Sequence, residues 1–167
     1  MAARTVLLLG DPRLYQVSEP VRPDELPALA SVVRDLHDTL MAFREKYGAG
    51  RAIAAPQIGV GKRLLYMNTG SPTVIINPEP DRWSREKMLV WDDCMCFPDL
   101  LVKVERHRSF RLRFRDLEWR EREMSLEGDL SELLQHEYDH LDGVLAVQRA
   151  VDGKSFALRS MRGLLDL

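Results

Sequence analysis

The sequence predicts an α+β domain. Three observations carry the prediction: an amphipathic segment over residues 26–47, a run of short strand-like segments over residues 48–115, and a second amphipathic segment over residues 130–142. A long helix, several short strands and a second buried helix are together typical of this fold class.

The amino-terminal region combines an irregular arm with a long helix. The first 23 residues contain Pro12, Pro20 and Pro23, and we expect an extended arm with turns. In the segment that follows, apolar residues recur at alternating intervals of three and four, which predicts one buried helix face. They are Leu26, Leu29, Val33, Leu36, Leu40, Phe43 and Tyr47. We expect Asp24 to cap the start of this helix and Gly48 to end it.

The middle of the chain is predicted to form short strands and turns. Strands are expected at residues 63–68, 73–77, 88–91 and 101–105. Apolar and basic residues then alternate within residues 104–115, which predicts a half-buried strand with a solvated basic face. One face carries Phe110, Leu112 and Phe114, and the other carries Arg111, Arg113 and Arg115.

Two helices are predicted near the carboxyl end. Asp129 precedes Leu130-Ser131-Glu132, which is a capping-box pattern, and it predicts a helix from residue 130 to about 142 that stops at Gly143. Its buried face is expected to consist of Leu130, Leu133, Leu134 and Leu141. A last short helix is predicted over residues 154–165, with Phe156, Met161 and Leu164 facing inward.

Composition narrows the class of protein. The 167 residues suit one domain over residues 1–167, and the 45% hydrophobic and 30% charged residues can supply a core and a polar surface. A formal net charge of −2 disfavours nucleic acid as the main partner, because duplex binding needs a basic excess. No apolar run approaches the ~20 residues of a membrane-spanning helix, and the early run at residues 6–9 is too short for a signal peptide. We therefore expect a cytoplasmic protein, or the mature part of an organellar one, that binds no membrane.

The segment His136-Glu137-Tyr138-Asp139-His140 carries recognisable chemistry. Two histidines four residues apart on a helix differ by ~40° around its axis and ~6 Å along it, so both imidazoles can face one metal ion. Glu137 can reach a metal-bound water without being a ligand, which is typical of metal-dependent hydrolases. The alternative is a surface helix that carries these residues by chance. The flanking leucines argue against it, because unpartnered His and Glu side chains are costly to bury.

Two histidines need a third protein ligand, and spacing alone leaves it open. No His, Glu or Cys follows His140, so the candidates lie upstream at Cys94, Cys96, His37 and His107. A thiolate is the strongest of these ligands, and cysteines one residue apart do not form a relaxed disulfide. One Cys and two His with an open fourth position are typical of a hydrolytic site, whereas a structural site fills all four positions.

Three segments, in order, resemble the motifs of peptide deformylases. Residues 50–59, Gly-Arg-Ala-Ile-Ala-Ala-Pro-Gln-Ile-Gly, resemble the glycine-rich first motif. Residues 92–98, Asp-Asp-Cys-Met-Cys-Phe-Pro, resemble the second, whose usual form is Glu-Gly-Cys-Leu-Ser, and residues 135–143, Gln-His-Glu-Tyr-Asp-His-Leu-Asp-Gly, are similar to the third. Residues 10–14, Gly-Asp-Pro-Arg-Leu, also resemble the family's amino-terminal segment, so the resemblance covers nearly the whole chain.

The resemblance implies antiparallel sheets packed around a central metal-binding helix, with a long amino-terminal helix and a short carboxy-terminal helix. It implies one divalent metal ion held by Cys94, His136 and His140. The ion would be physiologically ferrous iron, with zinc, nickel or cobalt as substitutes.

The same resemblance implies roles for residues around that ion. Glu137 would act as general base and then as general acid. Gln57 and the backbone N–H of Met95 would form an oxyanion hole. The substrate would contact Arg51, Asp93 and Leu133.

The implied activity is removal of the formyl group from the N-terminal formylmethionine of nascent polypeptides, with release of formate. The expected partners are an N-formylmethionyl peptide and, transiently, the ribosome, and the expected state is a monomer or homodimer.

Departures from the motifs keep two alternatives open. Asp92 stands for Glu and is expected to pair with an arginine such as Arg106. The other departures are Asp93 for Gly, Cys96 for Ser, Ala52 for Gly and Arg51 for an apolar residue. The alternatives are a related amidohydrolase with shifted substrate specificity and a metal-binding protein with little activity.

Overall fold

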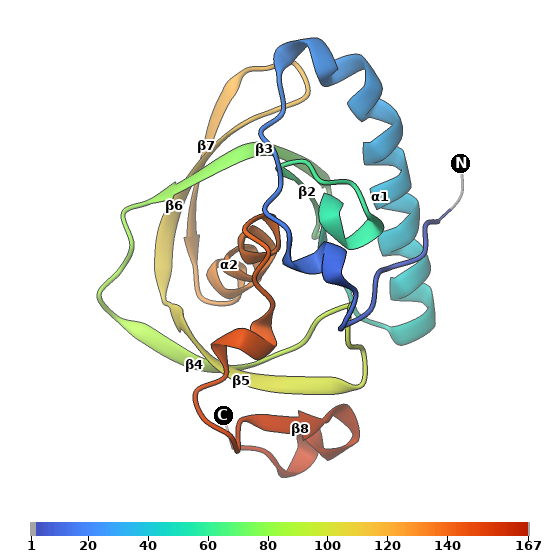
Figure 1. Ribbon diagram of the computed structural model, residues 1–167. Helices are drawn as coiled ribbons and strands as arrows, with labels where there is room; N and C mark the ends of the chain where they lie inside the picture. Colours follow the sequence, from blue (N-terminus) through green and yellow to red (C-terminus); the bar gives the residue numbers. More distant parts are fainter. Residues whose placement is uncertain (1–2, 167) are drawn as a thin grey trace.

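The computed structural model describes residues 3–166, and it places one helix between two antiparallel sheets (Figure 1). The domain predicted over residues 1–167 includes Met1, Ala2 and Leu167, which lie outside the described residues. Helix α2 (Asp129–Leu141) lies in the middle of the molecule, and α1 (Leu26–Tyr47) lies on its outside. The predicted α+β fold with antiparallel sheets and a long amino-terminal helix is confirmed.

The larger sheet has five strands in the order β1-β2-β3-β6-β7. Their bounds are β1 (Ala52–Ala54), β2 (Leu64–Asn68), β3 (Pro72–Asp81), β6 (Ser109–Arg115) and β7 (Glu121–Glu127). The smaller sheet has the order β4-β5-β8, with bounds β4 (Lys87–Asp92), β5 (Leu100–His107) and β8 (Phe156–Leu158). Every pair of neighbouring strands within these sheets is antiparallel.

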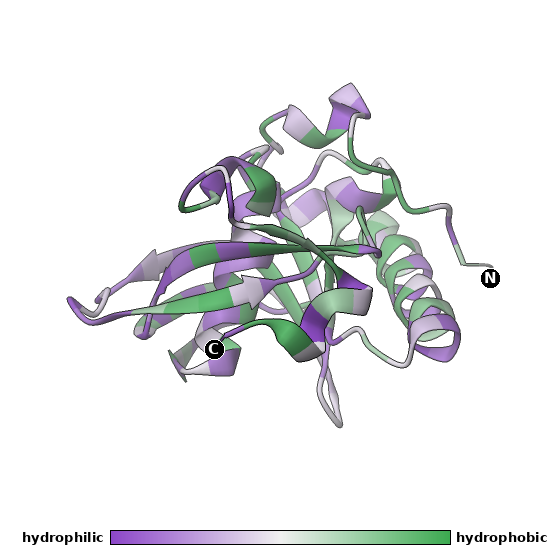
Figure 2. Ribbon diagram, turned by 90° about the horizontal axis from the view of Figure 1, so that it is seen from below, coloured by the Kyte–Doolittle hydropathy of each residue, from purple (hydrophilic) through white to green (hydrophobic). Residues whose placement is uncertain are grey.

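Helix α1 packs on β1 and β2 through the apolar face predicted from its periodicity. Leu36 and Leu40 are fully buried, whereas Tyr47 at the end of the stripe is exposed. Its ribbon in Figure 2 alternates between hydrophobic and hydrophilic stretches, as expected of an amphipathic helix. Gly48 ends the helix at a φ of 68°, as predicted. The prediction that Asp24 caps the start of this helix was wrong, because residues Pro23–Glu25 form a short 3-10 helix that leads into α1.

Helix α2 is buried between the sheets, and its fully buried Leu134 and Leu141 pack on side chains of the larger sheet. Leu130 and Leu133 are only half-buried. The predicted capping role of Asp129 was wrong. Gly128 precedes the helix, and the Asp129 carboxylate instead lies 3.1 Å from the guanidinium of Arg51.

The strand predicted within residues 104–115 is two strands in two sheets. The chain leaves the smaller sheet after β5 and joins the larger sheet at β6. The crossing residue is Arg108, whose N–H donates to the Glu86 carbonyl and whose carbonyl accepts from the Gly128 N–H. Strand β6 keeps the predicted alternation, with Phe110, Leu112 and Phe114 buried.

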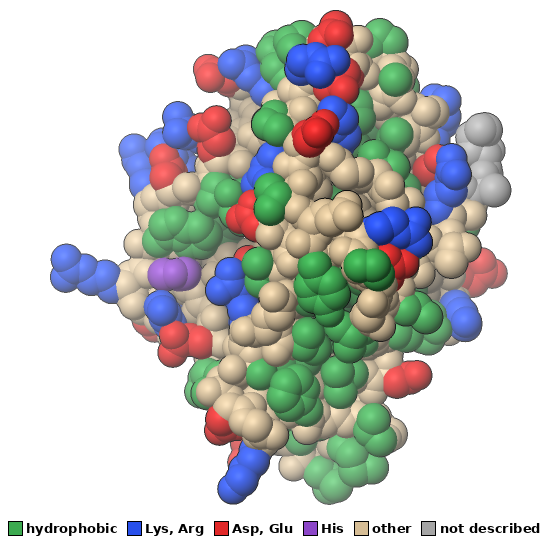
Figure 3. Space-filling view, viewed as in Figure 1, with side chains coloured by type: hydrophobic (Ala, Val, Ile, Leu, Met, Phe, Trp, Pro, Cys, Tyr) green, Lys and Arg blue, Asp and Glu red, His purple; other side chains and the backbone are tan. Residues whose placement is uncertain are grey.

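The carboxy-terminal helix is shorter than predicted. It is a 3-10 helix over Arg159–Leu164, and strand β8 precedes it where helix was expected. The prediction that its apolar residues face inward was also wrong, because Phe156, Met161 and Leu164 are 43%, 44% and 82% exposed. Figure 3 shows hydrophobic side chains gathered over this carboxy-terminal segment. Within the described residues, no helix is both long and apolar enough to cross a membrane.

Gly143, just after α2, is a position where only glycine fits. Its φ is 71°, and a Cβ atom there would lie 2.5 Å from the Tyr15 carbonyl oxygen of the amino-terminal arm. Gly143→Ala should therefore cost at least ~1–2 kcal/mol, since the left-handed conformation alone disfavours alanine by that amount. The expected fall in Tm is at least ~2–4 °C.

Gly153→Ala is the matched control for this measurement. A Cβ atom at Gly153 would have no neighbouring atom within 4 Å, and the backbone there is not in the left-handed region. Thermal unfolding should show a loss of Tm in Gly143→Ala alone. Equal Tm values for the two variants would contradict the packing of the arm on the end of α2.

Candidate metal centre

Helix α2 presents His136, Glu137 and His140 from one buried stretch, at exposed fractions of 5%, 4% and 1%. The two histidines are four residues apart, so their rings lie on the same side of the helix. Their Nε2 atoms are 3.2 Å apart. The helix therefore directs two imidazole nitrogens at one point, as the sequence spacing predicted.

Cys94 completes the cluster from the loop after β4. Its Sγ lies 3.4 Å from Nε2 of His140, and the ligand atoms of Cys94, His136 and His140 all lie within 4.8 Å of one another. All three side chains are buried. The structure thus brings together the three residues that could hold a metal ion.

The other upstream candidates are not part of this cluster. Nδ1 of His37 is 2.6 Å from the Tyr66 hydroxyl, and Nδ1 of His107 is 2.8 Å from the Ser84 carbonyl oxygen. Cys96 is buried beside Cys94 but falls outside the cluster found among the described residues. Both thiols are free, as expected for cysteines one residue apart.

The surroundings of His136 fit a metal ligand. Its Nδ1 lies 3.0 Å from Oδ2 of Asp92, and its other ring nitrogen, Nε2, faces His140. The Asp92 carboxylate therefore orients the ring so that Nε2 points at the cluster. Metal-ligating histidines usually donate their second ring N–H to such a carboxylate. One thiol and two imidazoles are also a donor set that zinc and other divalent transition metals accept. The residues present therefore fit a divalent ion.

Asp92 belongs to a buried ion-pair network. Arg106 lies 2.7 Å from Asp92 and 2.7 Å from Asp139, and Arg149 lies 2.6 Å from Asp139. The pairing of Asp92 with Arg106 is confirmed, whereas Asp139 and Arg149 were missed. Because each buried charge has a partner, the network can hold the His136 ring without leaving an isolated charge.

Burial and these charges move the pKa values of the cluster. Burial opposes ionisation of Asp92, but His136 and Arg106 outweigh it and lower the pKa of Asp92 to about 2. Burial raises the pKa of Glu137 to about 7 and also raises the pKa of the Cys94 thiol. A carboxyl group with a pKa near neutrality can both accept and donate a proton in water.

Glu137 and the predicted oxyanion donors lie next to the cluster. Oε2 of Glu137 is buried and has no hydrogen-bond partner among the described residues. The side-chain amide nitrogen of Gln57 is 3.8 Å from Sγ of Cys94, and its Oε1 accepts from the Ala54 N–H. Met95 follows Cys94 directly and lines the cavity above the cluster.

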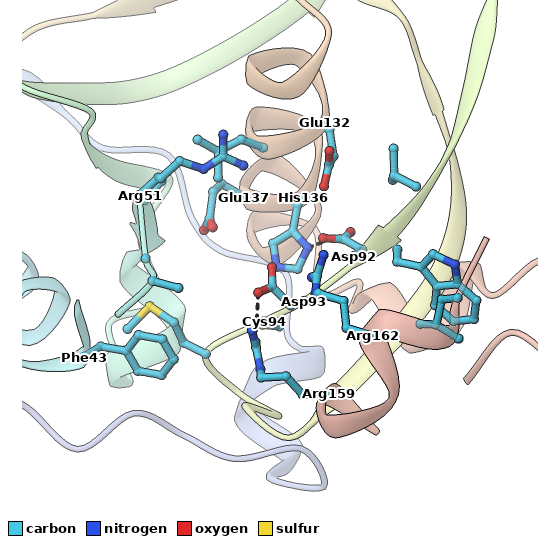
Figure 4. Close-up of a pocket in the computed structure, with 18 of the residues that line it drawn as sticks. Phe43, Arg51, Asp92, Asp93, Cys94, Glu132, His136, Glu137, Arg159 and Arg162 are labelled. Carbon is cyan, nitrogen blue, oxygen red and sulfur yellow. Dashed lines mark hydrogen bonds and ion pairs between the residues drawn. The ribbon is translucent and has the colours of Figure 1, made fainter. Parts of the chain in front are cut away.

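The cluster opens into a cavity of about 470 Å³ (Figure 4). The predicted substrate contacts Arg51, Asp93 and Leu133 all line it. Its walls also include residues that the sequence did not indicate as part of a site, namely Phe43, Trp91, Glu132, Arg159 and Arg162. Glu132 had a usable signal, because it lies one turn before His136 on α2; it was interpreted only as part of a helix cap.

Comparison with known families decides where this chain belongs. The family described as polypeptide deformylase matches residues 3–156. The chain belongs to this family. This result confirms the prediction that the chain is a hydrolase of the peptide deformylase type.

Individual polypeptide deformylases resemble the chain over most of its length. A peptide deformylase of Pseudothermotoga lettingae is 37% identical over 157 residues, which cover 93% of this chain and 88% of that protein. The crystal structure of the peptide deformylase from Thermotoga maritima matches at a TM-score of 0.82 and 28% identity, over 91% of this chain and all of that one (100%). A Met-Ala-Ser-bound class I type b peptide deformylase from Acinetobacter baumannii matches at a TM-score of 0.81 and 28% identity, over 89% of this chain and 98% of that one.

Proposed function

We propose that this chain, as one catalytic domain over residues 1–167, removes the formyl group from N-formyl peptides and releases formate. The proposed substrates are nascent polypeptides that begin with formylmethionine. The observation that carries the proposal is the convergence of Cys94, His136 and His140 at a cavity of about 470 Å³. Beside them lies a carboxyl oxygen of Glu137 that has no hydrogen-bond partner among the described residues.

The proposed cofactor is one divalent ion held by Cys94, His136 and His140, with ferrous iron as the physiological metal and zinc, nickel or cobalt as substitutes. When bound there, such an ion supplies Lewis-acid chemistry that lowers the pKa of water toward ~7. Asp92 orients His136 from behind, because its carboxylate lies 3.0 Å from Nδ1.

The proposed proton carrier is Glu137. Its carboxylate takes the proton of the attacking water and later delivers it to the departing amine of the peptide. The burial that raises its pKa to about 7 suits both steps.

Gln57 and the backbone N–H of Met95 are the proposed donors to the formyl oxygen, where negative charge develops. Gln57 is 1% exposed, and its Oε1 is held by the Ala54 N–H, so its amide nitrogen is fixed on the side of Cys94. Donors positioned in advance stabilise developing charge without reorganisation.

Several further properties belong to this proposal. Its substrates emerge from the ribosome, so we propose the cytoplasm as the place of action and a transient contact with the ribosome. The proposed state is a monomer or homodimer.

Formate release from formyl-Met-Ala-Ser tests the proposed function. The protein should be loaded anaerobically with ferrous iron, and its metal content measured alongside the rate. We expect about one bound ion per chain and steady formate release that a chelator abolishes. A full metal content without formate release from any N-formyl peptide would favour the alternative of a metal-binding protein with little activity.

Asp92→Ala should weaken metal binding by ~10–100-fold, because it removes the carboxylate that orients His136. Asp93→Ala is the control, since the neighbouring Asp93 carboxylate pairs with Arg159 at 2.8 Å and not with a histidine. Titration of the metal with a competing chelator measures both affinities. Equal losses in the two variants would remove the orienting role from Asp92.

A further inference from the structure

The side-chain amide of Gln57 is buried and makes a contact at each of its two ends. Its Oε1 accepts from the Ala54 N–H at 2.8 Å, and its Nε2 lies 3.4 Å from Sγ of Cys96. Because a backbone N–H needs an acceptor, the first contact fixes which end of the amide is oxygen. The nitrogen end therefore faces two sulfur atoms, the second of which is Sγ of Cys94 at 3.8 Å.

The two sulfur atoms are not equivalent partners for this amide. Sγ of Cys94 already accepts the Cys96 N–H at 3.4 Å, and it belongs to the cluster that could hold a metal ion. Sγ of Cys96 is outside the cluster found in the described part of the chain, and it is the nearer of the two sulfurs to Gln57. An amide nitrogen carries two N–H donors, so one can bond to Cys96 while the other stays available on the side of the cluster.

The amino-terminal arm holds the backbones of both residues. The Leu7 N–H donates to the Gln57 carbonyl at 2.8 Å, and the Leu9 N–H donates to the Cys96 carbonyl at 2.9 Å. Two backbone bonds to one short stretch of the arm fix Gln57 and Cys96 relative to each other. Both residues are only 1% exposed, so bulk water does not compete for the contact between amide and sulfur.

We propose that Cys96 is a positioning residue, whose sulfur accepts one N–H of Gln57 and thereby directs the other N–H toward the formyl oxygen of the substrate. The inference rests on the proposed function, in which Gln57 stabilises the charge that develops on that oxygen. A donor that is aimed in advance stabilises this charge without reorganisation. An amide that is held only at its oxygen end can turn its nitrogen away and loses part of that benefit.

Alanine and serine at position 96 make a matched pair of variants, because the two residues differ by one hydroxyl group. If the sulfur positions Gln57, Cys96→Ala should lower kcat for formyl-Met-Ala-Ser by ~3–10-fold, which is the effect of losing one neutral hydrogen bond. Cys96→Ser should restore most of the rate, because its hydroxyl oxygen is again an acceptor. If the sulfur only fills space in the core, the order reverses, because a hydroxyl without a partner is costly to bury.

The kinetic signature of the Cys96→Ala variant is also specific. The charge on the formyl oxygen develops only in the transition state, so the loss should fall on kcat and leave KM nearly unchanged. Metal content per folded chain should stay native in both variants, because Cys96 is outside the cluster. Loss of the metal ion in Cys96→Ala would overturn the proposal, since its effect would then come through the ion.

A double-mutant cycle with Gln57→Ala gives a readout that a purely structural role of Cys96 would not move. Gln57→Ala alone should lower kcat by ~10²–10³-fold, as expected for loss of one oxyanion donor. In that background Cys96→Ala should cost nothing further, because the group that Cys96 positions is gone. Additive losses in the double variant would show that Cys96 affects the rate by another route, and they would overturn the proposal.

Failure of this role is distinguishable from failure of the proposed function. Formate release by the native protein, with kcat in Cys96→Ala equal to or above that in Cys96→Ser, overturns the positioning role and leaves the deformylase function intact. Absence of formate release by the metal-loaded native protein from any N-formyl peptide overturns the deformylase function and the role of Cys96 together.

Discussion

Glu137→Gln is expected to lower kcat for formyl-Met-Ala-Ser by ~10²–10⁴-fold, since positioned acid–base groups contribute rate factors of that size. Glutamine keeps the shape and the burial of this position but cannot take up or deliver a proton. Because Glu137 is not one of the three residues of the cluster, the variant should keep the native metal content. Formate release and metal analysis on the same preparation measure both quantities.

The control for this variant is Glu127→Gln, the same exchange at the exposed position on β7. It should be native-like in rate and metal content. A near-native rate in Glu137→Gln would remove Glu137 from proton transfer. Loss of metal together with loss of rate would instead assign this carboxylate a part in holding the ion.

Cys94→Ser is expected to lose most of the bound metal and, with it, the deformylase activity. Sγ of Cys94 is the sulfur that lies 3.4 Å from Nε2 of His140. A serine oxygen is a much weaker ligand than a thiolate for a transition metal. Metal content after anaerobic loading, measured per folded chain, is the direct readout.

Cys96→Ser is the matched control, because Cys96 is a second buried thiol only two positions away. Its Sγ lies 3.4 Å from the side-chain amide of Gln57, a contact that a serine hydroxyl can largely replace. We expect a mild effect on rate and nearly full metal content. Full metal content in Cys94→Ser, or complete loss in Cys96→Ser, would show that the wrong thiol was assigned.

The elements predicted correctly from the sequence are those with a strong local pattern. Helix α1 has a buried stripe at helical spacing, and β6 alternates between buried phenylalanines and leucine on one side and arginines on the other. Strand β7 was missed because its sequence, Glu-Arg-Glu-Met-Ser-Leu-Glu, buries only Leu126. Its pairing with β6, and not its own composition, makes it a strand.

The prediction for the carboxy-terminal segment was wrong because it relied on a local pattern alone. Its apolar residues at helical spacing predicted a buried helix over residues 154–165. Three of its residues instead pair with the edge of β5, and the short helix that follows leaves its large apolar side chains exposed. Periodicity identifies an amphipathic face, but it does not show whether the fold supplies a surface to cover it.

The residues of the candidate site also differ in whether a local pattern could predict them. His136, Glu137 and His140 follow from the spacing within one helix, which is local information. The choice of Cys94 over Cys96 as the third ligand came from resemblance to a family. Local spacing could not make that choice, because the loop after β4 approaches α2 only through a tertiary contact. Glu132 was missed because its apparent role as a cap at the start of α2 concealed its position on the cavity wall.

X-ray absorption on the zinc-loaded protein tests the central claim most directly, which is that Cys94, His136 and His140 hold one divalent ion. The account predicts one sulfur neighbour at ~2.3 Å and two imidazole nitrogens at ~2.0–2.1 Å. It further predicts that the sulfur neighbour disappears in Cys94→Ser and persists in Cys96→Ser. A bound ion with no sulfur neighbour, or with two, would contradict the account.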